Sequence, residues 1–225
     1  MIVDAVSSMG GLPLPVDAWN IDICVTVANK TLEIPPAVAL LSIGPRAWEA
    51  IERRKSPRGW YLDLRTWRWY AENWSDWHPT PATMPTSNIV ALHHSLEMML
   101  EEGLESRYAA FRAACRAVRE GLRVLGFPML VEDAFASPLT TAAYLRPGLD
   151  ADDLLSWLSE HAGVVISGGI GELHGQIIRV GHIGAARKRD YVMALLLGIE
   201  DYLRAKGESI ACGTSLVALD GVEVS

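Results

Sequence analysis

Three side chains of this sequence have types and positions that suggest chemistry: Lys30, Asp4 and Arg179. Lys30 follows the β-branched run 22–27, which is typical of a strand. A lysine at that point must reach solvent, pair with an acid or act as a nucleophilic amine. Burial would lower the pKa of the amine and favour its reactive form. The sequence leaves a solvated lysine and a reactive lysine both open.

Asp4 and Arg179 occupy positions where α/β proteins often bind ligands. Asp4 directly follows the apolar residues 1–3, and the carboxyl ends of buried strands are common ligand sites in such sheets. Asp4 could equally cap the following turn. Arg179 interrupts the apolar run 177–180. Its guanidinium suits a bidentate grip on a carboxylate, and a structural arginine on an edge strand is the alternative.

Other groupings indicate less chemistry. His93 and His94 are adjacent, so their side chains point in different directions and do not form a ligand pair. The loop 168–171 lacks the Lys-Ser/Thr that follows a phosphate-binding P-loop. The three cysteines lie far apart, without a CxxC pair or a Cys/His cluster. We therefore expect no metal site and no disulfide framework, and a reducing cytoplasm as the compartment.

Alternating strands and helices are expected to position these residues, which predicts an α/β fold. The first three apolar runs are nearly continuous, which is typical of strands buried on both faces of a mixed or parallel sheet. Strands are predicted at 1–6, 22–27, 37–43, 129–131, 140–145, 164–166 and 177–180. Helices are predicted from Gly44-Pro45 onward, over 88–103 and 104–125, from Asp150 onward, and over 187–205. The tail after 206 has weak strand character.

Composition limits the classes of function. The chain has 225 residues, of which 50% are hydrophobic and 21% charged, as in a globular protein with a sizeable core. No apolar run reaches the roughly 18 residues that cross a bilayer, so we expect no membrane span. A net charge of −7 argues against nucleic acid as the main partner.

Residues 56–87 form an unusual segment. Six of the eight tryptophans lie between Trp48 and Trp77, and prolines are interleaved with them. The pattern predicts a long, partly ordered excursion. An aromatic surface packed on its own domain is one interpretation. A subunit contact or a substrate-cleft contact is the other, because aromatic residues are enriched in both.

Taken together, these residues lie in motifs that resemble the class V aminotransferases. This is the alanine–glyoxylate, serine–pyruvate and pyridoxamine–pyruvate group of pyridoxal 5′-phosphate (PLP) enzymes with fold type I. The motifs are DAVSSMGG at 4–11, WNID at 19–22, NKTL at 29–32, PP at 35–36, TMPTS at 83–87, EEGLE at 101–105, SPLTT at 137–141, GGIG at 168–171 and RVGHIG at 179–184. The resemblance extends to about residue 206.

The resemblance implies a role for each site residue. Lys30 would form the Schiff base with PLP and then carry the proton between the substrate and the cofactor. Asp4 would keep the pyridine nitrogen protonated, which makes the ring an electron sink. Val6 would pack against the ring face, and Thr83 would contact the cofactor phosphate of a neighbouring subunit. Arg179 would bind the substrate α-carboxylate.

The resemblance also implies domain limits. Residues 1–87 would be the C-terminal part of the PLP-binding large domain, and 88–105 a connecting helix. Residues 106–206 would form a complete small α/β domain, followed by a tail over 207–225.

Some positions depart from the family pattern. Asn29 precedes the lysine where glutamine is commoner, and Ala37 replaces the usual glycine after Pro-Pro. Ile170 stands where the pyridoxamine–pyruvate enzymes carry a second arginine, which disfavours that substrate. The histidine before the lysine and the loop cysteine of cysteine desulfurases are not evident.

The N-terminal part of the family fold has no counterpart in the sequence. That part supplies the first strands, the phosphate loop and the aromatic residue that stacks on PLP. We therefore expect a split enzyme, in which a separate N-terminal polypeptide completes a dimer or heterotetramer. It would transfer the amino group of a small amino acid to pyruvate or glyoxylate. Other PLP chemistry such as a lyase reaction, or a non-catalytic scaffold or truncated product, are the alternatives.

Overall fold

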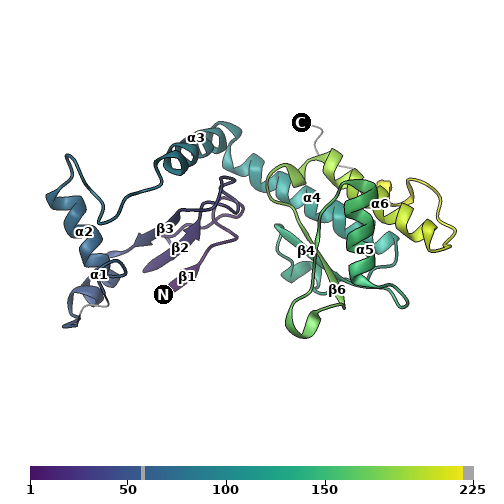
Figure 1. Cartoon of the computed structure of the whole chain (residues 1–225), viewed down its shortest axis with the longest axis horizontal. Helices are drawn as coiled ribbons and strands as arrows, with labels where there is room; N and C mark the ends of the chain where they lie inside the picture. The colour runs from purple at the N-terminus through teal and green to yellow at the C-terminus, as the bar shows by residue number, and fades with distance from the viewer. Residues whose placement is uncertain (57–58, 220–225) are drawn as a thin grey trace. The chain divides into compact units, whose positions relative to one another are not determined.

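Figure 1 shows the computed structural model, which describes residues 1–56 and 59–219. The chain divides into two compact units, Met1–Glu101 and Glu102–Ser225. Each unit combines a small sheet with helices, which confirms the predicted α/β class. Each is described by itself below.

The sheet of the first unit contains β1 (Ile2–Asp4), β2 (Ile23–Val27) and β3 (Ala39–Ile43), in that order. β1 runs parallel to β2, with Asp4 opposite Val25. β3 runs antiparallel to β2. The three predicted strands are therefore present, although β1 and β3 are shorter than predicted.

The two faces of this sheet differ. Successive side chains alternate between the faces. Cys24 and Thr26 are buried on one of them. On the other, Ile2 is 73% exposed and Leu41 is 47% exposed. The prediction that these strands are buried on both faces is therefore wrong for the described residues, because no described layer of this unit covers Ile2 and Leu41.

Three helices accompany this sheet. α1 (Pro45–Glu52) begins with Pro45 at its first turn, as predicted. α3 (Thr86–Glu102) starts two residues before the predicted helix. Its buried residues Leu92 and Met99 pack on the apolar cluster beside the sheet. α3 thus covers the end of the sheet at which β2 terminates.

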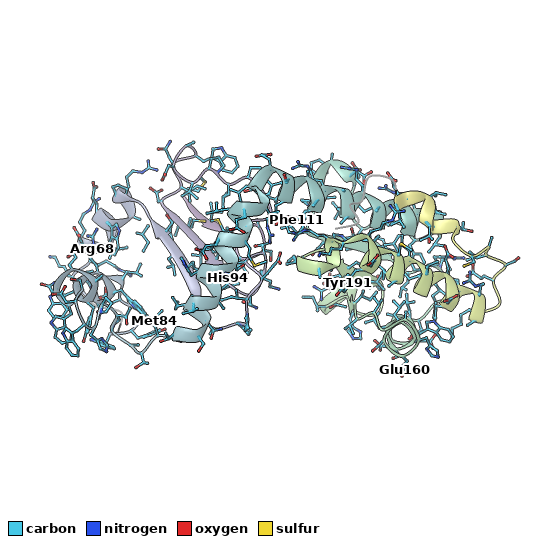
Figure 2. All side chains as sticks on the ribbon, turned by 90° about the horizontal axis from the view of Figure 1, so that it is seen from above. Arg68, Met84, His94, Phe111, Glu160 and Tyr191 are labelled. Atoms are coloured by element: carbon cyan, nitrogen blue, oxygen red, sulfur yellow. The ribbon has the colours of Figure 1, made fainter. Side chains whose placement is uncertain are left out.

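α2 (Leu64–Asn73) lies in the segment 56–87, for which no helix was predicted. The Asp63 carboxylate caps the helix by accepting a hydrogen bond from the Arg65 amide. The aromatic rings of the helix pack edge-on against one another, as do Tyr70 and Trp74. Arg68, which also lies in this helix, is labelled in Figure 2. Trp67 and Trp69 therefore lie in a helix, although no residue of α2 is buried.

The second unit begins with the long helix α4 (Leu104–Val124). Gly126, with φ +82°, ends it as predicted. The Phe127 amide donates back to the Leu122 carbonyl, at 2.9 Å, which closes the C-terminal turn. One face of α4 is buried, including Phe111, which is labelled in Figure 2.

The second sheet has the order β4-β6-β5 and is antiparallel throughout. Its strands are β4 (Thr140–Tyr144), β5 (Ser167–Gly168) and β6 (Ile177–Gly181). The strand predicted at 129–131 is wrong, since only one isolated bridge, between Met129 and Ala143, forms there. The strand predicted at 164–166 is also wrong. A π-helical turn at Leu158–Ala162 extends α5, and the strand β5 starts only at Ser167.

Helices α5 (Ala151–Trp157) and α6 (Arg189–Ala205) complete this unit, and Figure 1 shows them with α4 around β4 and β6. Asp150 caps α5 as predicted, accepting a 2.9 Å hydrogen bond from the Asp153 amide. Short 3-10 turns lie at Asp133–Phe135, Gly171–Leu173, Gly184–Arg187 and Thr214–Leu219. The last turn corrects the predicted weak strand of the tail; residues 220–225 of that tail lie outside the described residues.

Candidate active site

Parallel pairing brings Asp4 and Lys30 to one edge of the first sheet. Asp4 is the last residue of β1, and Lys30 lies in the turn that follows β2. Because β1 and β2 are parallel, their carboxyl ends meet at the same edge. Thr26 of β2 links the two strand ends, since its hydroxyl donates to the Ala5 carbonyl at 3.1 Å. Two of the sequence-predicted residues therefore lie at the same end of one sheet.

The Asp4 carboxylate caps the turn that follows it with one oxygen and leaves the other oxygen exposed. Its Oδ1 atom accepts a 2.9 Å hydrogen bond from the Val6 amide, which is the turn-capping geometry. The side chain is exposed, and among the described residues its other oxygen has no hydrogen-bond partner. The capping interpretation and the ligand interpretation are thus compatible. Val6, half-buried, lies directly beside this carboxylate.

The Lys30 side chain is exposed. Within the described parts of the chain its amine makes no hydrogen bond or ion pair. Of the options that the sequence left open, the lysine reaches solvent, rather than being desolvated or paired with an acid. The neighbouring residues Thr31 and Leu32 are, in contrast, 0% and 3% exposed. An exposed lysine is therefore followed directly by two buried residues of the same turn.

Thr83 is exposed, in the segment that leads into α3. Its hydroxyl is therefore available for a ligand. The predicted contact would be with a cofactor held by another subunit, so the position of Thr83 within its own chain does not test it.

Arg179 lies in the second unit, on β6, with Ala142 and Ser167 as its strand partners. Because β6 is the central strand, the interpretation as an edge-strand arginine is wrong. The side chain is half-buried, and its Nε atom donates to the Gly168 carbonyl at 2.7 Å. This bond fixes the guanidinium beside the loop 168–171.

A buried histidine follows the same strand. His182 is 0% exposed, and its Nε2 atom lies 2.9 Å from the Thr141 hydroxyl. Its Nδ1 atom is buried and has no hydrogen-bond partner within 1–56 and 59–219. Burial lowers the pKa of His182 to about 4, and the nearby charge of Arg119 lowers it further. The imidazole is therefore neutral near neutral pH.

Sequence reasoning did not find the residues that hold the Lys30 turn. Ser95 and Asn88, both on α3, hydrogen-bond the Leu32 and Pro35 carbonyls, at 2.6 Å and 3.1 Å. Ser95 is 63 positions away from Leu32 in the sequence. A serine inside a helix gives no local signal of such a distant contact.

No group of three or more His, Cys, Asp or Glu residues among the described residues is placed to hold a metal ion. The described helices include none that is long and apolar enough to cross a bilayer.

Comparison with known proteins finds relatives of this chain. No protein-family model matches the chain. A Synechococcus protein named soluble hydrogenase, small subunit, is 35% identical over 207 residues, 92% of this chain and 52% of that protein. Pyridoxamine–pyruvate transaminase of Mesorhizobium japonicum is 34% identical over 221 residues, 97% of this chain and 55% of that protein. The crystal structure of ureidoglycine–glyoxylate aminotransferase from Bacillus subtilis has a TM-score of 0.88 at 30% identity and covers 98% of this chain and 57% of that one.

The named aminotransferases among the relatives and structural neighbours of this chain are class V aminotransferases, and the chain matches about half of each. Alanine–glyoxylate aminotransferases are among the further relatives. The family has PLP fold type I and depends on PLP, so the fold and cofactor that the motifs implied are confirmed at the level of the family. The chain spans about half the length of the curated relatives that it matches.

The residues at the sheet edge fit the cofactor of this family. PLP needs an amine for its aldehyde, a carboxylate for its ring nitrogen and donors for its phosphate. Lys30 offers an exposed amine and Asp4 an exposed carboxylate oxygen, both at the same edge of one sheet. Among the predicted residues, only Thr83 offers a donor for the phosphate. The donor set therefore matches the reactive part of the cofactor more fully than its phosphate.

Proposed function

We propose that this chain supplies the lysine-bearing half of a PLP-dependent aminotransferase. The observation that carries the proposal is the parallel pairing of β1 with β2, which places Asp4 and Lys30 at one sheet edge with both side chains exposed. A carboxylate and an amine arranged in this way, in a chain with such relatives, suit binding of PLP better than a purely structural role.

When bound, PLP supplies an electron sink for the carbon that loses its proton. The Lys30 amine would hold the cofactor covalently and, once released, move the proton to and from the substrate. The Asp4 carboxylate would keep a proton on the ring nitrogen, and its bond to the Val6 amide would orient it. The Val6 side chain would lie against the ring. Thr83 would donate to the phosphate of a cofactor in a neighbouring subunit.

The second unit would supply the substrate carboxylate site. Arg179 has a guanidinium fixed at Nε by the Gly168 carbonyl. A guanidinium oriented in this way suits a carboxylate, and the exposed neighbour Ile170 adds no charge to the site. We propose a small amino acid as donor and pyruvate or glyoxylate as acceptor, on the basis of the names of the alanine–glyoxylate and pyridoxamine–pyruvate relatives. The domain limits at 87, 105 and 206 stay predictions, as does a cytoplasmic location.

The remaining half of the fold would come from a separate N-terminal polypeptide, in a dimer or a heterotetramer. Two observations support this part of the proposal. The chain matches about half the length of its relatives. In addition, the open sheet face with Ile2 and Leu41 offers apolar area that a further layer would bury.

The proposal is tested by co-expressing the chain with the adjoining reading frame and purifying any complex. We expect bound PLP with absorbance near the visible edge, and transamination when amino donors are screened with pyruvate and glyoxylate. Lys30→Ala should lower the transamination rate by a factor of about a hundred to ten thousand. Lys55→Ala, at an exposed lysine near the end of α1, is the matched control and should leave the rate unchanged.

Three outcomes would contradict the proposal. A colourless complex would argue for a scaffold, and full activity in Lys30→Ala would remove the lysine from the reaction. Elimination or decarboxylation products without amino transfer would indicate a lyase that uses the same residues.

A further inference from the structure

Side chains from two other segments hold the backbone of the turn that carries Lys30. The Thr31 hydroxyl donates a short hydrogen bond to the Met9 carbonyl, in the loop that follows Asp4. From the other side, the Ser95 hydroxyl of α3 donates to the Leu32 carbonyl at 2.6 Å. In each of these two hydrogen bonds, the donor and the acceptor residues are distant in sequence. The turn is therefore tied to the Asp4 loop and to α3 at consecutive positions.

The turn itself is tight and conformationally strained. The Glu33 amide donates to the Lys30 carbonyl at 3.0 Å, and the Ile34 amide donates to the Ala28 carbonyl at 3.1 Å. Glu33 has φ +59°, in the left-handed region that residues with a side chain rarely adopt. Such a conformation persists only where its surroundings fix it. The hydrogen bonds of Thr31 and Ser95 are part of those surroundings.

Packing leaves little room for the turn to shift. Leu32 is 3% exposed and packs with Leu92 and Met99 of α3. Gly10, in the Asp4 loop, has φ +80°, and a Cβ atom there would lie 2.7 Å from the Met99 Cε atom and 3.2 Å from the Leu32 Cδ2 atom. The Asp4 loop, the Lys30 turn and α3 therefore meet in direct contact.

The two hydroxyls are well placed to control the lysine without touching it. Lys30 has an exposed side chain and, within the described residues, no partner for its amine. The position of the Lys30 amine is thus set by the position of the Lys30 backbone, since no side-chain partner among the described residues holds the amine. A displacement of that backbone would change the approach of the amine to a group held by Asp4, and reactions of this kind are sensitive to shifts of about 1 Å.

We propose that Thr31 and Ser95 are positioning residues. They hold the Lys30 backbone in a fixed position relative to Asp4, so that the Lys30 amine and the Asp4 carboxylate can bind the same cofactor molecule. The inference rests on the proposed function. It goes beyond that function because it assigns the reactivity of the lysine to two hydroxyls that make no contact with its side chain.

The test measures covalent capture of PLP at Lys30 in the complex of the full chain with its partner half. Capture is followed by borohydride reduction and mass spectrometry, and the pH titration of the lysine–cofactor chromophore is recorded in parallel. Thr31→Val and Ser95→Ala each remove one hydroxyl, and each should slow capture per folded molecule about tenfold, the equivalent of one hydrogen bond. Both should also shift the titration of the chromophore.

Two controls separate positioning from stability. Thr31→Ser keeps the hydroxyl and should capture PLP at the wild-type rate, which is the expected rescue. Ser87→Ala makes the same substitution as Ser95→Ala, at an exposed position of α3, and should change neither readout. Capture is normalised to the folded fraction by circular dichroism, so that a variant that loses stability is still informative.

The outcomes distinguish the two levels of the proposal. If the wild type does not capture PLP at Lys30, the proposed function fails. If the wild type does, but Thr31→Val and Ser95→Ala match it in rate and titration, the positioning role alone is overturned. The same holds if these variants lose thermal stability while the folded fraction captures PLP normally.

Discussion

The two units of this chain bury their apolar residues to different degrees. In the second unit, α4, α5 and α6 share one large core with β4 and β6. In the first unit the described core consists of two small clusters, and Ile2 and Leu41 lie on an open sheet face. The candidate cofactor residues Asp4 and Lys30 belong to the open unit. The large single core thus belongs to the unit that carries Arg179, whereas Lys30 belongs to the unit whose sheet has an open face.

The largest expected difference between the units comes from one substitution made in each. Leu196→Ala removes a side chain that is 0% exposed in the second unit, and should lower the free energy of unfolding by about 3 kcal/mol. Leu41→Ala, at a residue that is 47% exposed, should lower it by less than about 0.5 kcal/mol in the isolated chain. Urea denaturation measures both. Equal losses would show that the face with Leu41 is buried in solution.

Gly10→Ala tests how tightly the first unit is packed between the Asp4 loop, the Lys30 turn and α3. The added Cβ would be strained at φ +80° and would press on Met99 and Leu32, so we expect a loss of about 2 kcal/mol in the free energy of unfolding. Gly148→Ala is the matched control, because Gly148 has φ +86° and its Cβ would meet nothing within 4 Å. It should cost only the strain, about 1 kcal/mol. If the two losses are the same, the contact between the Asp4 loop and the Lys30 turn is looser than described.

Acid should affect the second unit through His182. Its pKa is lowered to about 4 in the folded state, chiefly by burial, whereas an unfolded histidine titrates near 6.5. Below pH 6.5 the unfolded state therefore binds the extra proton, and stability that is complete above this pH is lost as the pH falls towards 4. Between pH 7 and pH 5 we expect a loss of about 2 kcal/mol in the free energy of unfolding.

A variant isolates this contribution. His182→Gln should flatten the pH dependence of the free energy of unfolding between pH 7 and pH 5, whatever its effect at pH 7. His93→Gln, at a histidine whose side chain is 74% exposed, should keep the wild-type slope. An unchanged slope in His182→Gln would mean that other groups cause the acid sensitivity.

Local patterns made much of the fold predictable. Helical spacing in α4 and α6, the β-branched run of β2 and the glycine stop at Gly126 are all encoded within a few residues. The helix α2 was missed, because its aromatic side chains are poor indicators of a helix and prolines surround it. β5 was misplaced because nothing in the sequence marks the π-helical turn at Leu158–Ala162.

The residues of the candidate site likewise include some that local sequence predicts and some that it does not. Asp4 and Lys30 could be named because each is a polar residue at the end of an apolar run. Thr31 and Ser95 could not, since their partners are set by the packing of α3 on the turn. The open face of the first sheet also depends on what covers it, which an apolar strand sequence does not specify.

The smallest expected effect concerns the helix caps of the two units. Asp150 caps α5 and Asp63 caps α2, each through a backbone amide in the first turn. Because α5 is part of a shared core, Asp150→Ala should lower the free energy of unfolding by about 1 kcal/mol. Because α2 has no buried residue, Asp63→Ala should instead release α2 locally, with faster amide hydrogen exchange over residues 64–73 and little change in global stability.

Hydrogen exchange and urea denaturation of both variants decide between local and global effects. A global loss in Asp63→Ala equal to that in Asp150→Ala would mean that α2 is as firmly integrated as α5. The exposed rings of Trp69 and Trp74, which contact each other and Tyr70, would then need further packing partners within their own unit. A purely local effect would instead mark α2 as a helix held mainly by its cap and its ring contacts, so the comparison between a closed and an open unit would extend from the sheets to the helices.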